Sequence, residues 1–379
     1  MISKDIETAQ PSRKPSLAFI HPFVFRFARG IERYVVNLGN ALLHQGADVD
    51  ILTWRWPTSI DWPEMDQALR IHRFPTPPYF AAKLMPAFYI HHLRKHRYDM
   101  LYLHFADYGE STTMNFLGRV SHSHPFSIVL HFPYDQAAHR YEHLKRTGLA
   151  AKATRLIAVS RYVGMLAESF FQSPCEVIHN GVDTEEFHPD QTVRAKVRAE
   201  LSLPENSLIL LTVAALEERK RVQNILRALP LVMAKVPNAY LVVLGDGPFR
   251  PMLESLIGEL QISNHVRLLP AQSGITRFFQ AADAFVFLAK GEAFSLATAE
   301  AMACQLPVVV ARHPPYEEFV DTSNGILVDP GNIQGIADAA IRLLSQPSLG
   351  QKLGAQGRQR ILQGYTWERA AHQYLSLLK

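Results

Sequence analysis

Cysteine is scarce in this sequence: the 379 residues contain two, Cys175 and Cys304. They match no zinc or redox spacing, so the sequence predicts no disulfide framework and favours a reducing compartment. Long apolar runs are missing as well. The apolar stretches have the length of strands, well below the about 18 residues that span a bilayer. We therefore expect a cytoplasmic protein that contacts a membrane, if at all, from its inner face.

A strong excess of charge is also missing, since 39 Lys and Arg face 35 Asp and Glu, with a formal net charge of +4. Nucleic-acid-binding domains usually gather basic residues, so we expect no nucleic acid partner. The first sixteen residues, MISKDIETAQPSRKPS, lack the apolar core of a signal peptide. With a hydrophobic content of 47%, the chain has the composition of a globular protein and a length that favours two domains.

Strand-like and helix-like segments alternate along the whole chain. SLAFI at 16–20 is a short apolar strand, and apolar residues then recur at helical spacing in IERYVVNLGNALLHQG. Turn residues and acids interrupt the alternation at 178–190, and it resumes with SLILLTVAA at 207–215. This pattern predicts an α/β protein with two doubly wound, Rossmann-like domains that face a central cleft.

The same pattern suggests limits for the domains. We predict a polar tail at 1–15, a first domain at 16–195, a second domain at 196–360 and a C-terminal helix at 361–379.

An acid inside an apolar segment gives the first sign of a functional site. In KGEAFSLATAEAMACQLPVVVA (Lys290–Ala311), Glu300 lies among small and apolar residues, and Glu292 precedes it. Buried carboxylates are costly unless they are paired or hydrogen-bonded. A helix that starts near Phe294, with Ser295 as its N-cap, would offer free N–H groups to a phosphate. Two carboxylates for hydroxyls beside a phosphate site suit a nucleotide sugar; the alternative is a solvent-facing Glu300 and a loop Glu292.

This stretch resembles the Glu-x7-Glu signature of the retaining GT-B glycosyltransferases, in particular glycosyltransferase family 4. The resemblance continues along almost the whole chain. Its other segments are GIERYVVNLGNALLHQGADVDILT, ATRLIAVS, VIHNGVDTEEFHP, AYLVVLGDGP, LPVVVA, NGILVDPGN and YTWERAAHQYLSLL, the last resembling a helix that crosses back to the first domain.

The resemblance implies a role for particular residues. Glu300 matches the acid that holds the ribose hydroxyls, and Glu292 the acid that contacts the donor sugar. Lys220 matches a lysine that neutralises the diphosphate, which suits its compact charge. His131 matches a histidine near the transferred sugar, although an ordinary strand-end histidine is the alternative. The other donor-binding residues that the resemblance implies are Gly30, Ala271, Phe294, Ser295 and Leu296.

The sequence also departs from the family pattern. Ala215 stands where the family has an arginine, so the diphosphate clamp lacks one cation, for which Arg219 or Arg221 could substitute. Ser295 and Gln305 replace glycines. In HPPYEEF, which replaces a glycine-rich turn, Glu317 fits the family's acid.

The expected function is therefore that of a retaining hexosyltransferase (EC 2.4). It would move a sugar from a nucleotide-diphosphate donor to a hydroxyl acceptor in glycan, polysaccharide or glycolipid biosynthesis. UDP-sugars are the first expectation for the donor and GDP-sugars the second, with no metal required. The alternative is a catalytically inactive GT-B homologue that acts as a partner or assembly subunit, which Ala215 and the missing glycines favour.

Three further patterns have simpler explanations. His139, Glu142 and His143 fit an H-x-x-E-H zinc motif, but no third ligand is identifiable. Asp48 and Asp50 mimic a metal-binding Asp-x-Asp, but they start a strand, so a structural role is expected. GDGPFR lacks the spacing of a dinucleotide fingerprint.

One segment favours contact with a lipid surface. YFAAKLMPAFYIHHLRKHR (Tyr79–Arg97) combines apolar residues with a basic end, as segments that lie on anionic lipid do. A helix packed on the first domain with a solvated basic tip is the alternative.

Overall fold

The structure is a computed structural model that describes residues 13–21, 24, 30–55, 65–75, 85–104 and 124–378. The chain forms two compact units. One comprises the chain up to 129 together with 143–156 and 371 onward, and the other comprises 130–142 and 157–370.

The first sheet is built from apolar strands. Its strand order is β3-β2-β1-β4-β5-β6-β7. Leu17 of β1 lies opposite Val49 of β2 and Met100 of β4, and both pairings are parallel. The strands are β1 (Ser16–Ile20), β2 (Asp48–Arg55), β3 (Arg70–Pro75), β4 (Met100–His104), β5 (Phe126–Leu130), β6 (Arg155–Ala158) and β7 (Cys175–Val177). Every residue of β4 and β5 is buried, as expected for a parallel sheet with helices on both faces.

The helices that follow these strands bury one apolar side. In α1, Tyr34, Val35, Leu38 and Leu42 recur at helical spacing and are all buried. These helices are α1 (Gly30–His44), α2 (Met85–Lys95), α4 (Tyr134–Arg146), α5 (Leu149–Lys152) and α6 (Arg161–Phe171).

The second sheet has the strand order β10-β9-β8-β11-β12-β13, and its strands are parallel. The strands are β8 (Leu208–Val213), β9 (Ala239–Leu244), β10 (Val266–Leu269), β11 (Ala284–Phe287), β12 (Val308–Ala311) and β13 (Gly325–Val328). The chain moves outward from β8 to β10 and then returns to β11 on the other side of β8. Ligands of doubly wound sheets bind at such a switch point, beyond the carboxyl ends of the strands. The prediction of two doubly wound parallel sheets is confirmed.

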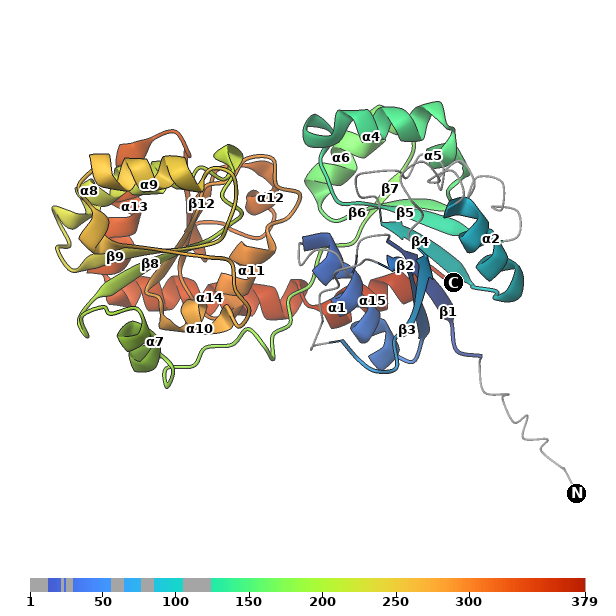
Figure 1. Ribbon diagram of the computed structural model, residues 1–379, viewed down its shortest axis with the longest axis horizontal. Helices are drawn as coiled ribbons and strands as arrows, with labels where there is room; N and C mark the ends of the chain where they lie inside the picture. The colour runs from blue at the N-terminus through green and yellow to red at the C-terminus, as the bar shows by residue number, and fades with distance from the viewer. Residues whose placement is uncertain are drawn as a thin grey trace, which may run out of the picture. The chain divides into compact units, whose positions relative to one another are not determined.

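Helices cover both faces of the second sheet. Figure 1 shows α8, α9 and α13 along one face and α10, α11 and α14 along the other. The helices of this part are α7 (Arg194–Glu200), η2 (Glu218–Lys220), α8 (Val222–Met233), α9 (Arg250–Glu259), η3 (Ser263–His265), α10 (Thr276–Ala281), α11 (Leu296–Ala303), α12 (Pro314–Glu317), α13 (Ile333–Ser345), α14 (Pro347–Gly364) and α15 (Trp367–Ser376).

The end of α15 belongs to the first unit. The Tyr374 hydroxyl lies 2.7 Å from the Tyr34 hydroxyl, and the Tyr374 ring packs edge-on against Tyr102. Residues 361–364 still belong to α14, so the last helix begins later than the sequence suggested. The domain limits themselves stay predictions.

Gly354 allows α14 to pack closely on the turn after α11. A Cβ at this position would lie 2.1 Å from the backbone oxygen of Gln305. Helix propensity alone predicts that Gly354→Ala stabilises the helix by about 1 kcal/mol. Because a backbone oxygen cannot move as a side chain tip can, we expect a net loss of about 2 kcal/mol or more in the free energy of unfolding. Urea denaturation measures it.

The control is Gly357→Ala in the same helix, where the new Cβ would meet the Met302 methyl at an ordinary 3.5 Å. This variant should be neutral or more stable than the wild type. Equal stability of the two variants would contradict the close contact at Gly354.

Gln305 has a backbone conformation that favours glycine. Its φ is +62°, its N–H donates to the oxygen of Met302, and the N–H of Leu306 donates to the oxygen of Ala301. This pair of bonds is the Schellman arrangement, whose left-handed residue is usually glycine. The Gln305 side chain is exposed, so its removal costs little packing. We expect Gln305→Gly to raise the free energy of unfolding by about 0.5–1 kcal/mol.

Thermal and urea unfolding of Gln305→Gly and Gln305→Ala test this expectation. Alanine keeps the Cβ that makes the left-handed conformation unfavourable, so only glycine should stabilise. An equal gain in both variants would show that the glutamine side chain, and not the backbone angle, is responsible.

Candidate nucleotide-sugar site

Two loops at the switch point of the second sheet bring opposite charges together. Residues 214–221 follow β8, and residues 288–295 follow β11, the strand beside it. The Lys220 Nζ lies 2.6 Å from Glu292 Oε1, and an Arg219 guanidinium nitrogen donates to the same oxygen over 2.8 Å. A second link joins the loops, because the Lys290 N–H donates to the Arg219 carbonyl. The sequence placed these three side chains in one site, and the structure brings them into contact.

The Glu292 carboxylate is ionised although it is largely buried. Burial alone would raise its pKa, but the charges of Lys220 and Arg219 and the hydrogen bonds from both hold the pKa below its ordinary value. The Lys220 side chain is 10% exposed, and its ammonium lies 5.4 Å from the centre of the Phe287 ring. Glu292 therefore holds two cations side by side that would otherwise repel each other, which is the preorganisation that a doubly charged diphosphate requires.

The second acid of the signature lies on α11. Glu300 is the fifth residue of this helix, and its exposed fraction is only 4%. The simpler alternative, a solvent-facing Glu300, is therefore wrong. The neighbouring residues of α11 are Ala and Thr, so the carboxylate lies in a segment that is otherwise built for the core.

Ser295 precedes α11, as expected, but its side chain does not cap the helix. Its hydroxyl is 2.8 Å from the Thr298 hydroxyl, and no backbone N–H of α11 bonds to it. The prediction of a side-chain N-cap is wrong, because φ of +84° and ψ of 79° turn Ser295 away from the usual N-cap conformation. A positive φ also explains why a glycine is usual at this position.

The remaining donor-binding residues predicted on the second sheet differ in their exposure and in the groups that they could offer to a ligand. Arg221 directly precedes α8 and has a left-handed φ of 56°, and it is Arg219 that contacts Glu292. The Phe294 ring is buried and stacked on Phe319, so only its backbone can contact a ligand. Leu296 is half-buried at the first turn of α11. Ala271 is exposed after β10, and its N–H is bonded to Asp246.

Two predicted residues belong to the first sheet. His131 directly follows β5 and is buried, and Gly30 is the exposed first residue of α1. Both follow the carboxyl end of a strand, since the loop before Gly30 starts after β1. Their roles stay predictions.

Two adjacent acids in the turn after β12 have different surroundings, and the match of Glu317 to the family's acid stays a prediction. Glu317 is exposed, whereas Glu318 is buried and accepts hydrogen bonds from the backbone N–H groups of Arg161 and Tyr162 at the start of α6. The His179 imidazole lies 2.7 Å from the same carboxylate. Adjacent acids have no sequence pattern that distinguishes them. Only the packing of the turn shows that Glu318 satisfies the free N–H groups of α6.

The histidines of the H-x-x-E-H motif lie on α4. His139 is exposed on α4, and the His143 ring faces Arg146 over 3.3 Å. Among the described residues, the H-x-x-E-H segment does not form a group that could hold a metal ion.

Residues 79–84 of the proposed lipid-contacting segment lie outside the described residues. In α2, Tyr89 and Leu93 are buried, and Arg94 and Lys95 are exposed. Within the ranges that the structure describes, no helix combines the length and the hydropathy needed to cross a bilayer.

Comparison with known proteins agrees with this geometry. The family model described as Glycosyl transferases group 1 matches residues 193–360, and the one described as Glycosyltransferase Family 4 matches residues 28–186. The chain is 28% identical over 201 residues to the N-acetyl-alpha-D-glucosaminyl L-malate synthase of Bacillus anthracis, which covers 52% of each chain.

The chain is also 29% identical over 233 residues to a GDP-mannose-dependent alpha-(1-6)-phosphatidylinositol monomannoside mannosyltransferase of Mycolicibacterium smegmatis. This alignment covers 58% of this chain and 60% of that one. These alignments thus span little more than half of both relatives.

A solved structure shows the same fold over nearly the whole chain. The Anabaena protein HepE in complex with UDP and glucose has a TM-score of 0.81, with 96% of this chain and 98% of that one covered at 18% identity. The two family models together match every strand of both sheets except β1, and they match the loops that bear Lys220 and Glu292. The chain belongs to the glycosyltransferases of the group 1 and family 4 type, and it has the GT-B fold.

Proposed function

We propose that this glycosyltransferase moves a hexose from a nucleoside diphosphate sugar to a hydroxyl group, with retention of the anomeric configuration. The contact of Lys220 and Arg219 with Glu292 at the switch point of the second sheet is the main support. Two cations beside an ionised carboxylate can receive a diphosphate leaving group, and the carboxylate remains available to a sugar hydroxyl.

In this proposal the residues divide the work. The diphosphate pairs with the ammonium of Lys220 and the guanidinium of Arg219. Arg219 thereby substitutes for the family arginine, at whose position this chain has Ala215. Glu292 then turns from the cations toward hydroxyls of the donor sugar. The first N–H groups of α11 stabilise the negative charge that develops as the sugar leaves. Glu300 holds the ribose. Because cations and N–H groups neutralise the diphosphate, the proposal needs no metal ion at this site.

The donor can be identified by its effect on stability. A ligand that binds only the folded protein raises the free energy of unfolding by RT ln(1 + [L]/Kd). Purified protein should therefore melt at a higher temperature with the nucleoside diphosphate of its donor. UDP is the first expectation, since HepE was solved with UDP, and GDP the second, since the M. smegmatis relative is GDP-mannose-dependent. ADP serves as the comparison.

Turnover separates an enzyme from an inactive homologue. The melting experiment identifies the nucleoside diphosphate of the donor. When the protein is incubated with sugar conjugates of that nucleotide and with hydroxyl acceptors, it should release the nucleoside diphosphate. The anomeric proton coupling in the NMR spectrum of the product should match that of the donor. If the protein binds the nucleotide but releases no nucleoside diphosphate from the donor, neither by transfer nor by slow hydrolysis, the result would favour an inactive partner subunit. Release with an inverted product would refute retention alone.

The acceptor is proposed only as a class. The names of the two relatives contain L-malate and a phosphatidylinositol monomannoside, and both compounds carry hydroxyl groups. A glycan or a lipid-linked glycan is our proposal for this chain. Contact with a membrane would depend on the basic end of α2 and on residues 79–84, because the buried apolar side chains of α2 pack inside the domain.

A further inference from the structure

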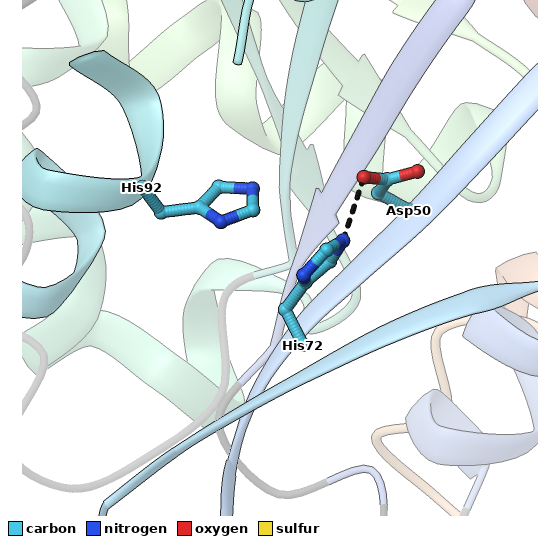
Figure 2. Close-up of side chains that lie close together, drawn as sticks. All are labelled: Asp50, His72 and His92. Atoms are coloured by element: carbon cyan, nitrogen blue, oxygen red, sulfur yellow. Dashed lines mark hydrogen bonds and ion pairs between the residues drawn. The ribbon is translucent and has the colours of Figure 1, made fainter. Parts of the chain in front are cut away.

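A second group of ligand-type side chains lies in the first unit. Asp50, His72 and His92 each place a potential ligand atom within 4.8 Å of the others. They come from β2, β3 and α2, and Figure 2 shows the carboxylate and the two imidazoles together in one place. Asp50 and His72 are the third residues of their strands, so the group lies near the amino ends of β2 and β3. The catalytic loops of such sheets follow the carboxyl ends instead.

The Asp50 carboxylate is the centre of this group. It is buried, and its Oδ2 lies 2.8 Å from His72 Nε2 and accepts the Tyr98 hydroxyl proton over 2.6 Å. Since the only proton of Tyr98 is used in this way, the His92 Nε2 at 2.8 Å from the same hydroxyl must be the donor of that bond. Asp50 Oδ1 accepts from Arg70 Nε over 2.6 Å.

A third imidazole adjoins the group. His96 lies one helical turn after His92, and the two rings stack with centroids 4.3 Å apart. The His72 ring is 4.3 Å from His92 and 5.9 Å from His96. His96 is exposed, so a change of its side-chain rotamer would not disturb the core. A histidine pair at i and i+4 with a third histidine and a carboxylate is a ligand set that zinc uses.

We propose that Asp50, His72 and His92, with His96 as the fourth ligand, form a structural site for a zinc ion. The metal would replace the proton that His72 Nε2 shares with Asp50 Oδ2. Zinc–nitrogen and zinc–oxygen bonds of about 2.0–2.1 Å in a tetrahedral arrangement need the two atoms about 3.3 Å apart, so the opening from 2.8 Å is small. Tyr98 would stay as the hydrogen-bond donor that orients the ligating carboxylate.

Arg70 is a cation that competes with the metal for Asp50, because it bonds to the other carboxylate oxygen, Oδ1. Its side chain is 52% exposed, and one guanidinium nitrogen already lies 4.0 Å from Asp48 Oδ2. It can therefore release Asp50 and pair with Asp48 at the surface. Of the two acids in the Asp-x-Asp pair, Asp50 would then bind the zinc ion and Asp48 would pair with Arg70.

Such a site would fasten α2 to the edge of the first sheet. Among the strands that the structure describes, β3 is the last on its side of the sheet and pairs with β2 alone. A metal bound by two strands and one helix would stabilise this edge, and it would do so independently of the transfer reaction.

The test uses the full-length protein without a histidine tag, freed of metal with a chelator. Titration with Co²⁺, followed by its visible d–d absorption, should show one tetrahedral site per chain, and Zn²⁺ should displace the cobalt. One equivalent of Zn²⁺ should raise the melting temperature. His72→Asn and His92→Asn should each weaken zinc binding by about 100-fold or more, beyond the about 10- to 100-fold effect of residues that only orient ligands.

Two variants separate a metal site from a purely hydrogen-bonded network. Arg70→Ala should bind zinc about tenfold more tightly, because the competing cation is gone, whereas Tyr98→Phe should bind about tenfold more weakly. His44→Asn is the matched control: His44 lies 3.1 Å from Asp66 on the surface of the same unit. It should bind zinc as the wild type does.

Binding of less than one equivalent of Zn²⁺ by wild type at micromolar concentrations would overturn the proposal. So would uptake that His72→Asn, His92→Asn and His44→Asn all leave unchanged. The folded state of each variant is verified by circular dichroism. If a histidine variant does not fold, the proposal is still tested by the opposite changes in zinc affinity that are expected for Arg70→Ala and Tyr98→Phe.

Discussion

Replacement of Lys220 by alanine should lower kcat by a factor of about 10²–10³, which corresponds to about 2.7–4 kcal/mol of lost transition-state stabilisation. The ammonium lies 2.6 Å from Glu292 at the switch point of the second sheet, where the diphosphate is proposed to bind. Negative charge grows on the leaving group as the sugar departs, so a fixed cation acts more strongly in the transition state than in the bound donor. Steady-state release of nucleoside diphosphate measures the effect, with the donor in excess.

The division of the effect between kcat and KM is informative. A lysine that only attracts the donor would raise KM and leave kcat unchanged. Lys235→Ala, on an exposed site of the same domain, is the control for a general loss of positive charge. Arg219 still pairs with Glu292 in the Lys220→Ala variant, so the fold should persist. A kcat within threefold of the wild type, in a folded protein, would remove Lys220 from the proposed site.

Replacement of Glu300 by glutamine should weaken binding of the donor's nucleoside diphosphate by about 10- to 100-fold, since hydrogen bonds to a charged group contribute about 1.5–3 kcal/mol. The amide has nearly the shape of the carboxylate but lacks its charge and offers one acceptor oxygen instead of two. Calorimetric titration of wild type and Glu300→Gln with the nucleoside diphosphate gives the ratio of dissociation constants.

A nucleotide without ribose hydroxyls makes this test specific. The wild type should bind the 2′,3′-dideoxy nucleotide far more weakly than the ribonucleotide, and Glu300→Gln should bind the two nearly alike. Glu205→Gln, on the exposed surface before β8, should discriminate as the wild type does. If Glu300→Gln loses affinity for both nucleotides equally, Glu300 supports the fold of α11 and does not bind the ribose.

Glu300 was identifiable in the sequence because its charge conflicts with its apolar surroundings, whereas Lys220 was assigned only through the resemblance to the family. An acid between alanines in an apolar helix must be satisfied by something, and the structure confirms that Glu300 is buried. Replacement of glycine at 295 and 305 was visible as well. The structure adds that both residues have positive φ, at +84° and +62°, so the departures from the family pattern cost backbone strain.

Local pattern alone decided the class of fold, because parallel strands and the helices that cover them have distinct periods of hydrophobicity. It also decided which loops bear the charged residues, since these loops follow predicted strands. Tertiary structure decided which neighbour acts: Arg219 and not Arg221 contacts Glu292, and Glu318 and not Glu317 is buried. Adjacent residues differ in direction only once the backbone is folded.

The zinc site proposed here depended on tertiary structure entirely. Asp50, His72 and His92 are separated by 22 and 20 residues along the chain, and no spacing rule connects them. Their encounter follows from the parallel pairing of β2 with β3 and from the packing of α2 beside both strands. Sequence determined that these ligands exist, and the order of the strands determined that they meet.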